Sequence, residues 1–457
     1  MRKNCVILPI ETTSRELNSK ILLACQLATK NIPVLLGTKN YARKASYFLN
    51  NSVFIDKGYH KDISEDIYKN LKFNGCSIVL LDEEGMDYED FRLLDERITN
   101  QIIPIFDKIF LLGKFQKNYL KKNRTNYREE KFIISGNPRF DLLDKKFTKL
   151  FKDKAEKIKR KHKDFILFAT DNKLSNNINT REHVYNNYKS RIPDIKKLFE
   201  YGDKLFIENI RLIKKIYKNT DFNIVVRPHP EENKNKYEDF LKDFKDRVRV
   251  IYEDSSIYWV FASSCVIVNH STTAIEGYVL KKKILAYIPI KLKKNMFPYL
   301  PISCSEKHAS SKTLLSSLCT HNFKKSKKKE YLLRENLNIG KGSKLSIQII
   351  TDVLIKNYNF KIDLFEKVKM NILQYIIMFL DFKSFLKANI FNVKKDKLSS
   401  NKLSDMNSQF ISKRFDEISK FIDSKENLSL KKIGNELYLI KKKRNLSNYL
   451  KNNLHFR

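Results

Sequence analysis

The stretch CVILPIETTSRELNSKILLACQLA, residues 5–28, decides the fold because it joins a short apolar run to an amphipathic helix. Residues 5–10, CVILPI, are typical of a buried strand. The apolar residues that follow recur at the spacing of one helix face: Leu17, Ile21, Leu22, Cys25 and Ala28. A buried strand followed directly by a helix is the building unit of an α/β sheet.

The same alternation continues along the chain, and glycine follows most of the early apolar runs although the sequence holds only 11 glycines. The first strand candidates after residue 10 are 33–36, 53–55, 77–81, 109–112 and 132–134. Beyond the charged stretch 145–163, the candidates are 165–169, 222–226, 248–252, 266–269 and 284–287. Alternating strands and helices predict parallel, doubly wound sheets.

A chain of 457 residues is too long for one ordinary core and predicts two domains with an appended tail. The predicted fold class is α/β, with two doubly wound, Rossmann-like parallel-sheet domains and a mostly helical C-terminal tail. The expected units are an N-terminal domain at 1–147, a helical connector at 148–163, a C-terminal domain at 164–342 and a basic tail at 343–457. Residues 343–432 contain neither Gly nor Pro, which favours helix there.

The balance of 89 Lys and Arg against 52 Asp and Glu gives a formal net charge of +37, which favours an anionic partner. The alternative is a solvated Lys-rich surface, because scarce Gly and abundant Lys, Asn and Ile also fit an AT-rich genome. The six cysteines form no CxxC pair, as expected of reduced thiols in a cytoplasmic protein. No export signal is recognised at the N-terminus.

Polar residues follow several strand candidates, at the sheet edge where ligands of doubly wound domains bind. Leu81 leads into Asp82, Glu83, Glu84 and Gly85. Crowded carboxylates raise one another's pKa, which suits a general base. We expect Glu84, beside the permissive Gly85, to be that base, with Glu83 as the other candidate. A solvated acidic turn is the structural alternative.

A second group of polar residues, RPHPEE at 227–232, follows the strand candidate 222–226. Two prolines flank His229 and restrict its backbone, so the imidazole is aimed rather than mobile. Arg227 adds a cation to the same position. We expect His229 to have a function at the site, with Arg227 beside it, whereas the alternative is a histidine with a structural role.

The third group, NHSTTAIEG at 269–277, follows the strand candidate 266–269. Ser271 and Thr272 stand where a helix begins, so their hydroxyls suit a phosphate, although a plain N-cap would need the same residues. Glu276 suits either a ribose hydroxyl or the first turn of the helix.

Residues after the first strand, Glu11, Arg15 and Lys20, are expected to face the cleft from the opposite domain. The segment SGNPRFD at 135–141 is expected to be a structural exit from a strand into a helix, rather than part of the site.

Six segments together resemble the bacterial family called surface carbohydrate biosynthesis proteins. They are ILPIETTSRELNSKILLACQLA (7–28), FIDKG (54–58), LDEEG (81–85), SGNPRFDLL (135–143), RPHPE (227–231) and NHSTTAIEG (269–277). That family is similar to the two-domain glycosyltransferases of the GT-B type. The resemblance implies a GT-B arrangement with the nucleotide mainly on the C-terminal domain and the acceptor on the N-terminal domain.

A narrower likeness is to bacterial sialyl-, polysialyl- and Kdo-transferases, which share a D/E-D/E-G motif, an HP motif and a later Ser-Thr pair. It implies that Glu83 or Glu84 activates the acceptor, and that His229 and the pair Ser271 and Thr272 hold the leaving CMP phosphate. Residues 169–173, ATDNK, depart from the Asn-rich segment of those enzymes. The HP and Ser-Thr motifs also occur in teichoic-acid glycerophosphotransferases, which makes a CDP-polyol the alternative donor.

No DxD motif occurs, and no His, Cys or carboxylate group has the spacing of metal ligands. We therefore expect no metal and no other cofactor, with the leaving phosphate neutralised by His229, Arg227 and helix N-termini. The expected function is an inverting glycosyltransferase of cell-surface polysaccharide synthesis that takes a CMP-activated acidic sugar. A CDP-polyol phosphotransferase is the alternative enzyme.

The expected partners are a nucleotide-activated donor, a glycan or lipid-linked acceptor and the anionic inner-membrane surface. The Lys-rich block 324–329 and the helix 365–386 are expected to hold the chain peripherally on that membrane, mainly by charge. Residues 372–380, the longest apolar run, are too short to span a bilayer, and their alternative role is to pack across the two domains. A non-enzymatic basic scaffold is the rival class; nucleic acid is not expected, because basic and aromatic residues are not interleaved.

Overall fold

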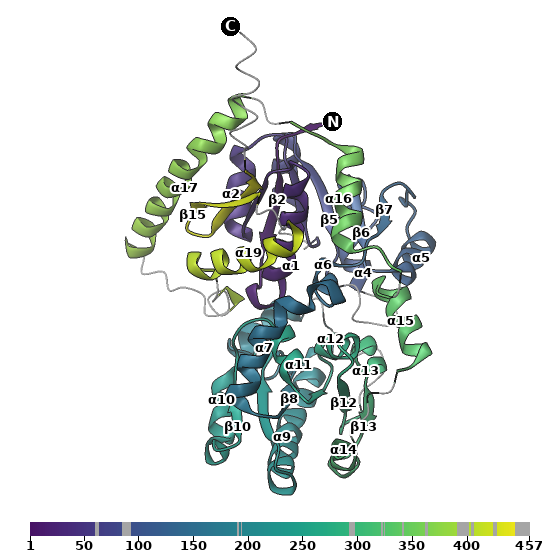
Figure 1. Ribbon diagram of the computed structural model, residues 1–457. Helices are drawn as coiled ribbons and strands as arrows, with labels where there is room; N and C mark the ends of the chain where they lie inside the picture. The colour runs from purple at the N-terminus through teal and green to yellow at the C-terminus, as the bar shows by residue number, and fades with distance from the viewer. Residues whose placement is uncertain are drawn as a thin grey trace.

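The computed structural model describes residues 1–457 apart from 60–63, 85–92, 190, 191, 193, 292–297, 321, 322, 324, 341, 362, 363, 391–401, 404, 405, 424–426 and 444–457. Figure 1 shows two α/β domains, one above the other, with the helix α7 (Thr148–His162) near their junction. The predicted fold class is confirmed: both domains are built on sheets of parallel strands that alternate with helices along the chain. Gly85, Lys324 and the predicted loop around 394–404, except residues 402 and 403, lie outside the described residues.

The N-terminal sheet has eight strands in the order β15-β16-β3-β2-β4-β5-β6-β7. Its parallel strands are β2 (Val6–Ile10), β3 (Val34–Thr38), β4 (Val53–Asp56), β5 (Ser77–Leu81), β6 (Lys108–Leu111) and β7 (Phe132–Ile134). Alternate residues of β2 enter two separate cores, because successive side chains of a strand point to opposite faces. The helices of this domain are α1 (Thr13–Thr29), α2 (Lys39–Phe48), α3 (Ser64–Phe73), α4 (Leu93–Arg97), α5 (Lys114–Asn123) and α6 (Pro138–Asp141).

The C-terminal sheet has six parallel strands in the order β10-β9-β8-β11-β12-β13. They are β8 (Phe165–Ala169), β9 (Asn223–Arg227), β10 (Val248–Val250), β11 (Cys265–Val268), β12 (Lys283–Tyr287) and β13 (Glu306–His308). The helices are α8 (Arg181–Tyr188), α9 (Ile195–Asn219), α10 (Lys234–Phe240), α11 (Ser256–Ala262), α12 (Thr273–Val279), α13 (Tyr299–Cys304) and α14 (Ser311–Leu318). The strand order reverses between β8 and β11, and the gap at such a switch point is where these sheets bind ligands.

The remaining chain returns to the N-terminal domain and is mostly helical, as predicted. Its helices are α15 (Lys327–Leu337), α16 (Ser346–Asn357), α17 (Leu364–Ile390) and α19 (Ser408–Ile422), and α1 packs against both α16 and α19. The carboxylate of Asp141 accepts the backbone N–H groups of Ser346 at 2.9 Å and Ile347 at 2.8 Å, which fixes the start of α16. Asp141, the last residue of SGNPRFD, therefore has the structural role expected of that segment.

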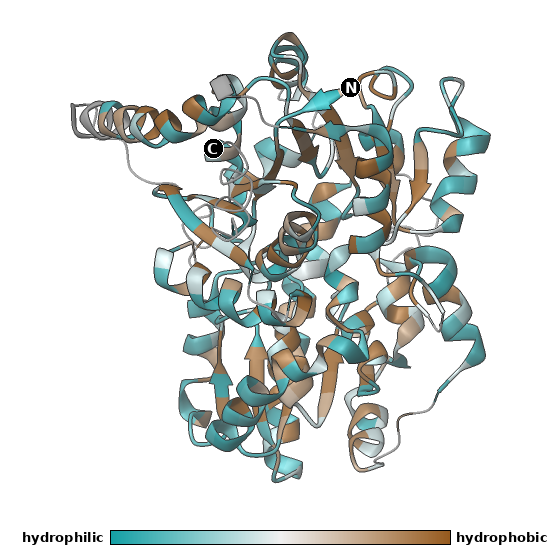
Figure 2. Cartoon of the chain, turned by 45° about the horizontal axis from the view of Figure 1, so that its top comes forward, coloured by the Kyte–Doolittle hydropathy of each residue, from teal (hydrophilic) through white to brown (hydrophobic). Residues whose placement is uncertain are grey.

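The helical prediction for residues 428–432 is wrong, because they belong to a hairpin. β15 (Leu428–Gly434) and β16 (Leu437–Lys442) extend the N-terminal sheet, with β16 antiparallel to β3. Gly37 allows this approach, since a Cβ there would lie 2.5 Å from the carbonyl oxygen of Glu436. Hydropathy colouring shows the strands of this domain largely brown (Figure 2), and every residue of β3, the strand that the hairpin covers, is buried.

Candidate functional site

A cavity in the cleft is lined by residues of both domains, at the carboxyl edge of the C-terminal sheet. Thr170 follows β8 and Ser271 follows β11, so the cavity lies at the switch point of that sheet. The N-terminal domain contributes Arg15 from α1 and Arg139 from α6. The cavity also holds His229 and Thr272, and we call it the donor pocket after the role that the sequence predicts for these residues.

A buried carboxylate fixes the loop that carries His229. Glu232 accepts the backbone N–H of His229 at 2.9 Å and the hydroxyls of Thr170 and Tyr237 at 2.8 Å each. Glu232 is 3% exposed, so these hydrogen bonds replace its hydration. From the tail, Lys402 forms a 2.7 Å ion pair with Glu231 on the same loop. The imidazole is therefore held in position, as the flanking prolines suggested.

The imidazole of His229 is neutral at physiological pH. Burial, with the nearby charge of Lys173, lowers its pKa to about 4. Its Nδ1 accepts the backbone N–H of Glu231 at 3.2 Å, which places the proton of the neutral ring on Nε2. His229 thus presents one N–H donor, which suits a phosphate oxygen.

Arg227 lines the donor pocket, but its guanidinium is engaged by the backbone. Nη1 donates to the carbonyl of Glu253 at 2.6 Å, and Nη2 donates to the carbonyl of Asp254. Asp254 has a left-handed backbone with φ of 57°, which turns its carbonyl toward Arg227. Arg227 therefore positions the turn that borders the pocket, and its expected contact with a phosphate stays a prediction.

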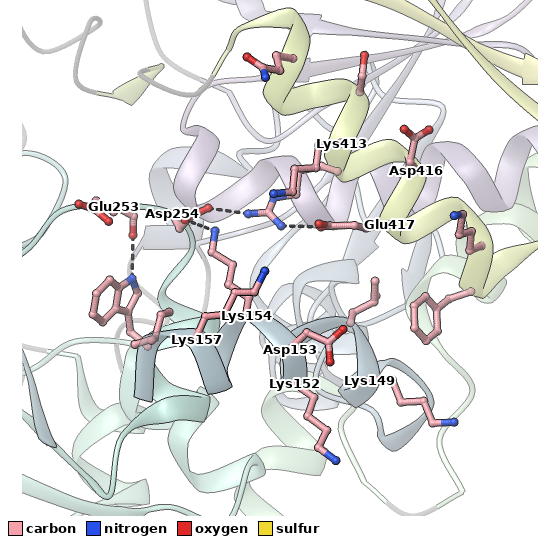
Figure 3. Close-up of a pocket in the computed structure, with 18 of the residues that line it drawn as sticks. Lys149, Lys152, Asp153, Lys154, Lys157, Glu253, Asp254, Lys413, Asp416 and Glu417 are labelled. Atoms are coloured by element: carbon pink, nitrogen blue, oxygen red, sulfur yellow. Dashed lines mark hydrogen bonds and ion pairs between the residues drawn. The ribbon is translucent and has the colours of Figure 1, made fainter. Parts of the chain in front are cut away.

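A larger cavity of about 1090 Å³ lies behind this turn, between α7 and α19 (Figure 3). The carboxylate of Asp254 accepts a hydrogen bond from Arg414 of α19 at 2.7 Å and another from Lys154 of α7. The indole N–H of Trp259 donates to the carbonyl of Glu253 at 3.0 Å (Figure 3). The tail therefore helps to hold the two carbonyls that Arg227 contacts.

Ser271 and Thr272 lie directly before the N-terminus of α12, and both line the donor pocket. Thr272 is the N-cap of α12, and the hydroxyl of Ser271, one residue earlier, accepts the backbone N–H of Thr273 at 3.3 Å and donates to its hydroxyl at 3.0 Å. The carboxylate of Glu276, in contrast, accepts hydrogen bonds from Arg139 at 2.9 and 2.5 Å and from Ser256 at 2.8 Å. Glu276 is 3% exposed and is not among the residues that line the donor pocket, and its expected contact with a ribose stays a prediction.

Arg139 is the residue that the sequence analysis missed. It lies in the segment SGNPRFD, spans the cleft to Glu276 and borders the donor pocket. Nothing local in that segment marks an arginine that pairs with a carboxylate 137 residues away in the chain.

The N-terminal side of the cleft is a dense cluster of charges. Its acids are Glu11, Glu16, Asp82, Glu83 and Glu84, and its cations are Arg15, Lys20, Lys57 and Arg97. Lys57 is buried and lies 2.6 Å from Glu11 and 3.4 Å from Glu16, whereas Lys20 lies 3.1 Å from Glu16. Glu11, Arg15 and Lys20 therefore belong to one network of charges on the N-terminal side of the cleft, and their expected contact with an acceptor stays a prediction.

The two candidate bases differ in their surroundings. Burial favours protonation of Glu84, but the cations of Arg97 at 2.7 Å, Lys57 at 3.7 Å and Arg15 at 3.6 Å outweigh it and hold its pKa far below the ordinary value. Burial raises the pKa of Glu83, and Lys20 at 3.6 Å opposes this only in part. These pKa directions favour Glu83 over the expected Glu84, because a base works best when its pKa is near the working pH.

The Glu83 carboxylate is connected to the donor pocket. Glu83 lines a small cavity together with Arg15 and Arg139, and the same two arginines line the donor pocket. The described residues contain no group of three or more His, Cys, Asp or Glu side chains able to hold a metal ion. The Glu83 carboxylate therefore lies in a cavity next to the one that holds His229, and the guanidinium groups of Arg15 and Arg139 line both.

A scan against protein-family models finds no match, and no curated protein matches the chain. Among solved structures, the wall teichoic acid polymerase TagF is similar at 12% identity and a TM-score of 0.42, over 78% of this chain and 88% of that one. The UDP-GlcNAc 2-epimerase from Neisseria meningitidis, bound to UDP-GlcNAc, has 12% identity and a TM-score of 0.47, over 78% and 100%. The corresponding enzyme of Methanocaldococcus jannaschii has 14% identity and a TM-score of 0.45, over 78% and 99%.

Proposed function

We propose that the chain is an inverting glycosyltransferase of cell-surface polysaccharide synthesis that takes a nucleotide-activated sugar, with a CMP-activated acidic sugar as the donor. The observation that carries this proposal is the neutral, fixed His229 beside Ser271 and Thr272, with the Glu83 carboxylate in the adjoining cavity. A sugar transfer requires a site that holds the leaving phosphate on one side of the cleft and a base for the acceptor hydroxyl on the other.

The proposed reaction is a single displacement. The Glu83 carboxylate accepts the proton of an acceptor hydroxyl, whose oxygen forms the new bond to the anomeric carbon. The bond between that carbon and the phosphate oxygen breaks, and the phosphate leaves with the electron pair. Attack from the side opposite the leaving group inverts the anomeric configuration.

Charge that develops on the leaving phosphate is stabilised by donors fixed before the reaction. We assign this role to the Nε2–H of His229 and to the hydroxyls of Ser271 and Thr272, which line one pocket. Arg15 and Arg139 add positive charge from the opposite domain. The acceptor is a glycan or lipid-linked sugar that lies against the Glu11, Arg15 and Lys20 side of the cleft.

The test is a screen of CMP-, CDP- and UDP-activated compounds for thermal stabilisation, followed by a transfer assay with mass detection of the product. A CMP-activated acidic sugar is expected to raise the melting temperature, because a bound ligand stabilises the folded state. Stabilisation by a CDP-polyol instead, with transfer of a polyol phosphate, would reassign the chain as a phosphotransferase. No stabilisation by any nucleotide would contradict the proposal.

Replacing Arg139 by alanine is expected to raise the KM for the donor about 10- to 100-fold, because the guanidinium that the proposal places beside the donor phosphate is lost. Glu276→Gln keeps a hydrogen-bond acceptor for Arg139 and is expected to change KM far less. Arg128→Ala, at an exposed arginine, is the control. Equal losses in Arg139→Ala and Glu276→Gln would mean that the pair only joins the domains.

Transfer is expected to continue in EDTA at an unchanged rate. In the proposed reaction the guanidinium charges, together with the imidazole and hydroxyl hydrogen-bond donors, stabilise the leaving phosphate without a metal. The measurement is the initial rate before and after dialysis against the chelator. A rate that falls in EDTA and returns on addition of Mg²⁺ or Mn²⁺ would show that the phosphate needs a metal.

A further inference from the structure

The outward face of α17 is the largest concentration of exposed apolar side chains in the described part of the chain. Six of the thirteen exposed large apolar residues lie on it, with exposures from 42% to 69%. They are Val368, Ile372, Tyr375, Met378, Phe379 and Phe382, and we call them the α17 face. Five of them recur every three or four residues, so they form one stripe along the helix.

The opposite side of α17 already has its packing partner. Leu373 and Ile377 are buried in the core shared with α2 and the β15–β16 hairpin. Asp381 accepts hydrogen bonds from Tyr41 at 2.6 Å and Asn435 at 3.0 Å, which ties the helix to the domain. The apolar run therefore packs with one side only, on the N-terminal domain and not across the two domains. A surface helix that is apolar on both sides needs a second partner for its outer face.

The charges around the α17 face suit an anionic partner. Between residues 366 and 383 the only acids are Glu366, which is buried, and Asp381, which is held by the domain. Lys367 and Lys383 are exposed near the two ends of the face. The adjoining hairpin adds further exposed lysines: Lys431, Lys432, Lys441 and Lys442.

We propose that the α17 face inserts into the headgroup region of a bilayer rich in anionic lipids. Phe and Tyr side chains suit the boundary between headgroups and acyl chains, while flanking lysines are attracted to anionic headgroups. A second copy of this chain fits less well, because two such faces would bring lysines together. The helix itself lies on the surface, since no helix among the described residues is long and apolar enough to cross a membrane.

This placement rests on the proposed function in one respect, namely that a lipid-linked acceptor would reach the N-terminal domain, to which α17 belongs. The sequence predicts membrane binding mainly by charge, through the block 324–329 and the helix 365–386. Figure 1 shows α15, which begins in that block, on the other side of the molecule from α17. Lys329 of that block donates to the carbonyls of Cys304 and Ser305. These contacts favour α17, the other of the two segments expected to bind the membrane, over the block 324–329.

The test is co-sedimentation of the full chain with vesicles of phosphatidylglycerol and phosphatidylcholine. The variant Tyr375→Gln/Phe379→Gln/Phe382→Gln is expected to lower the partition coefficient roughly a hundredfold at constant salt, because three inserted rings are lost. Its melting temperature and its nucleotide-induced stabilisation should match wild type. Phe73→Gln removes another exposed ring, outside α17, and should bind vesicles as wild type does.

Vesicle binding that is equal in wild type and the triple variant would overturn the proposal, as would wild-type protein that stays in the supernatant at low salt. Sedimentation velocity without lipid separates the second-copy explanation: a dimer that the triple variant dissociates would assign the face to self-association. Nucleotide stabilisation is read in the same samples, so a failure of the donor site is distinguishable from a failure of the membrane contact.

Discussion

His229→Ala is expected to lower the rate of transfer by roughly 10²- to 10³-fold, the loss typical of removing one fixed donor to a developing negative charge. Donor binding should weaken as well, because the Nε2–H is placed by the fixed loop before any ligand arrives. The fold should persist, since Glu232 holds the loop through the backbone N–H of residue 229, which alanine retains.

The control for this substitution is His183→Ala, at an exposed histidine on α8. Circular dichroism and the melting temperature report the fold, and steady-state kinetics report kcat and KM separately. A purified His229→Ala protein with near wild-type turnover would disprove the role given to the imidazole.

Glu83→Gln is expected to lower kcat by roughly 10²- to 10⁴-fold, the contribution of a positioned general base. Only the unprotonated carboxylate accepts a proton, and burial raises its pKa. The rate of the wild-type enzyme should therefore fall as the pH is lowered through this raised pKa, at a higher pH than for an ordinary glutamate. His229 stays neutral over that range, because its pKa is about 4.

Glu84→Gln is the matched comparison, since it changes the neighbouring carboxylate. We expect a smaller loss of kcat and a lower melting temperature, because Arg97 is nearly buried and would lose the carboxylate 2.7 Å away. A dead Glu84→Gln with an active Glu83→Gln would return the base to Glu84. Full activity of both would make residues 82–85 a structural turn.

Much of the architecture could be predicted because it follows from local periodicity. Apolar runs of strand length and helical faces recur within a few residues, and each predicted strand appears as a parallel strand of one of the two large sheets. The groups at the strand ends could also be found, since Glu83, His229 and Ser271 follow strands whose carboxyl ends meet at the cleft.

What could not be predicted depends on contacts between distant parts of the chain. Arg139 pairs with Glu276, and Arg414 of the tail reaches Asp254 near the donor pocket. The β15–β16 hairpin joins an edge whose position is set only by the folded sheet. The preference for Glu83 over Glu84 likewise depends on the cations of Arg97, Lys57 and Arg15 near Glu84. No local sequence pattern predicts that these side chains lie there.

The most direct test of the central claim is the position of the phosphate in a crystal structure of the chain with bound CMP. The account predicts phosphate density in the donor pocket, within hydrogen-bond distance of the Nε2 of His229 and of the hydroxyls of Ser271 and Thr272. CMP bound in the larger cavity between α7 and α19, with the donor pocket empty, would contradict the account.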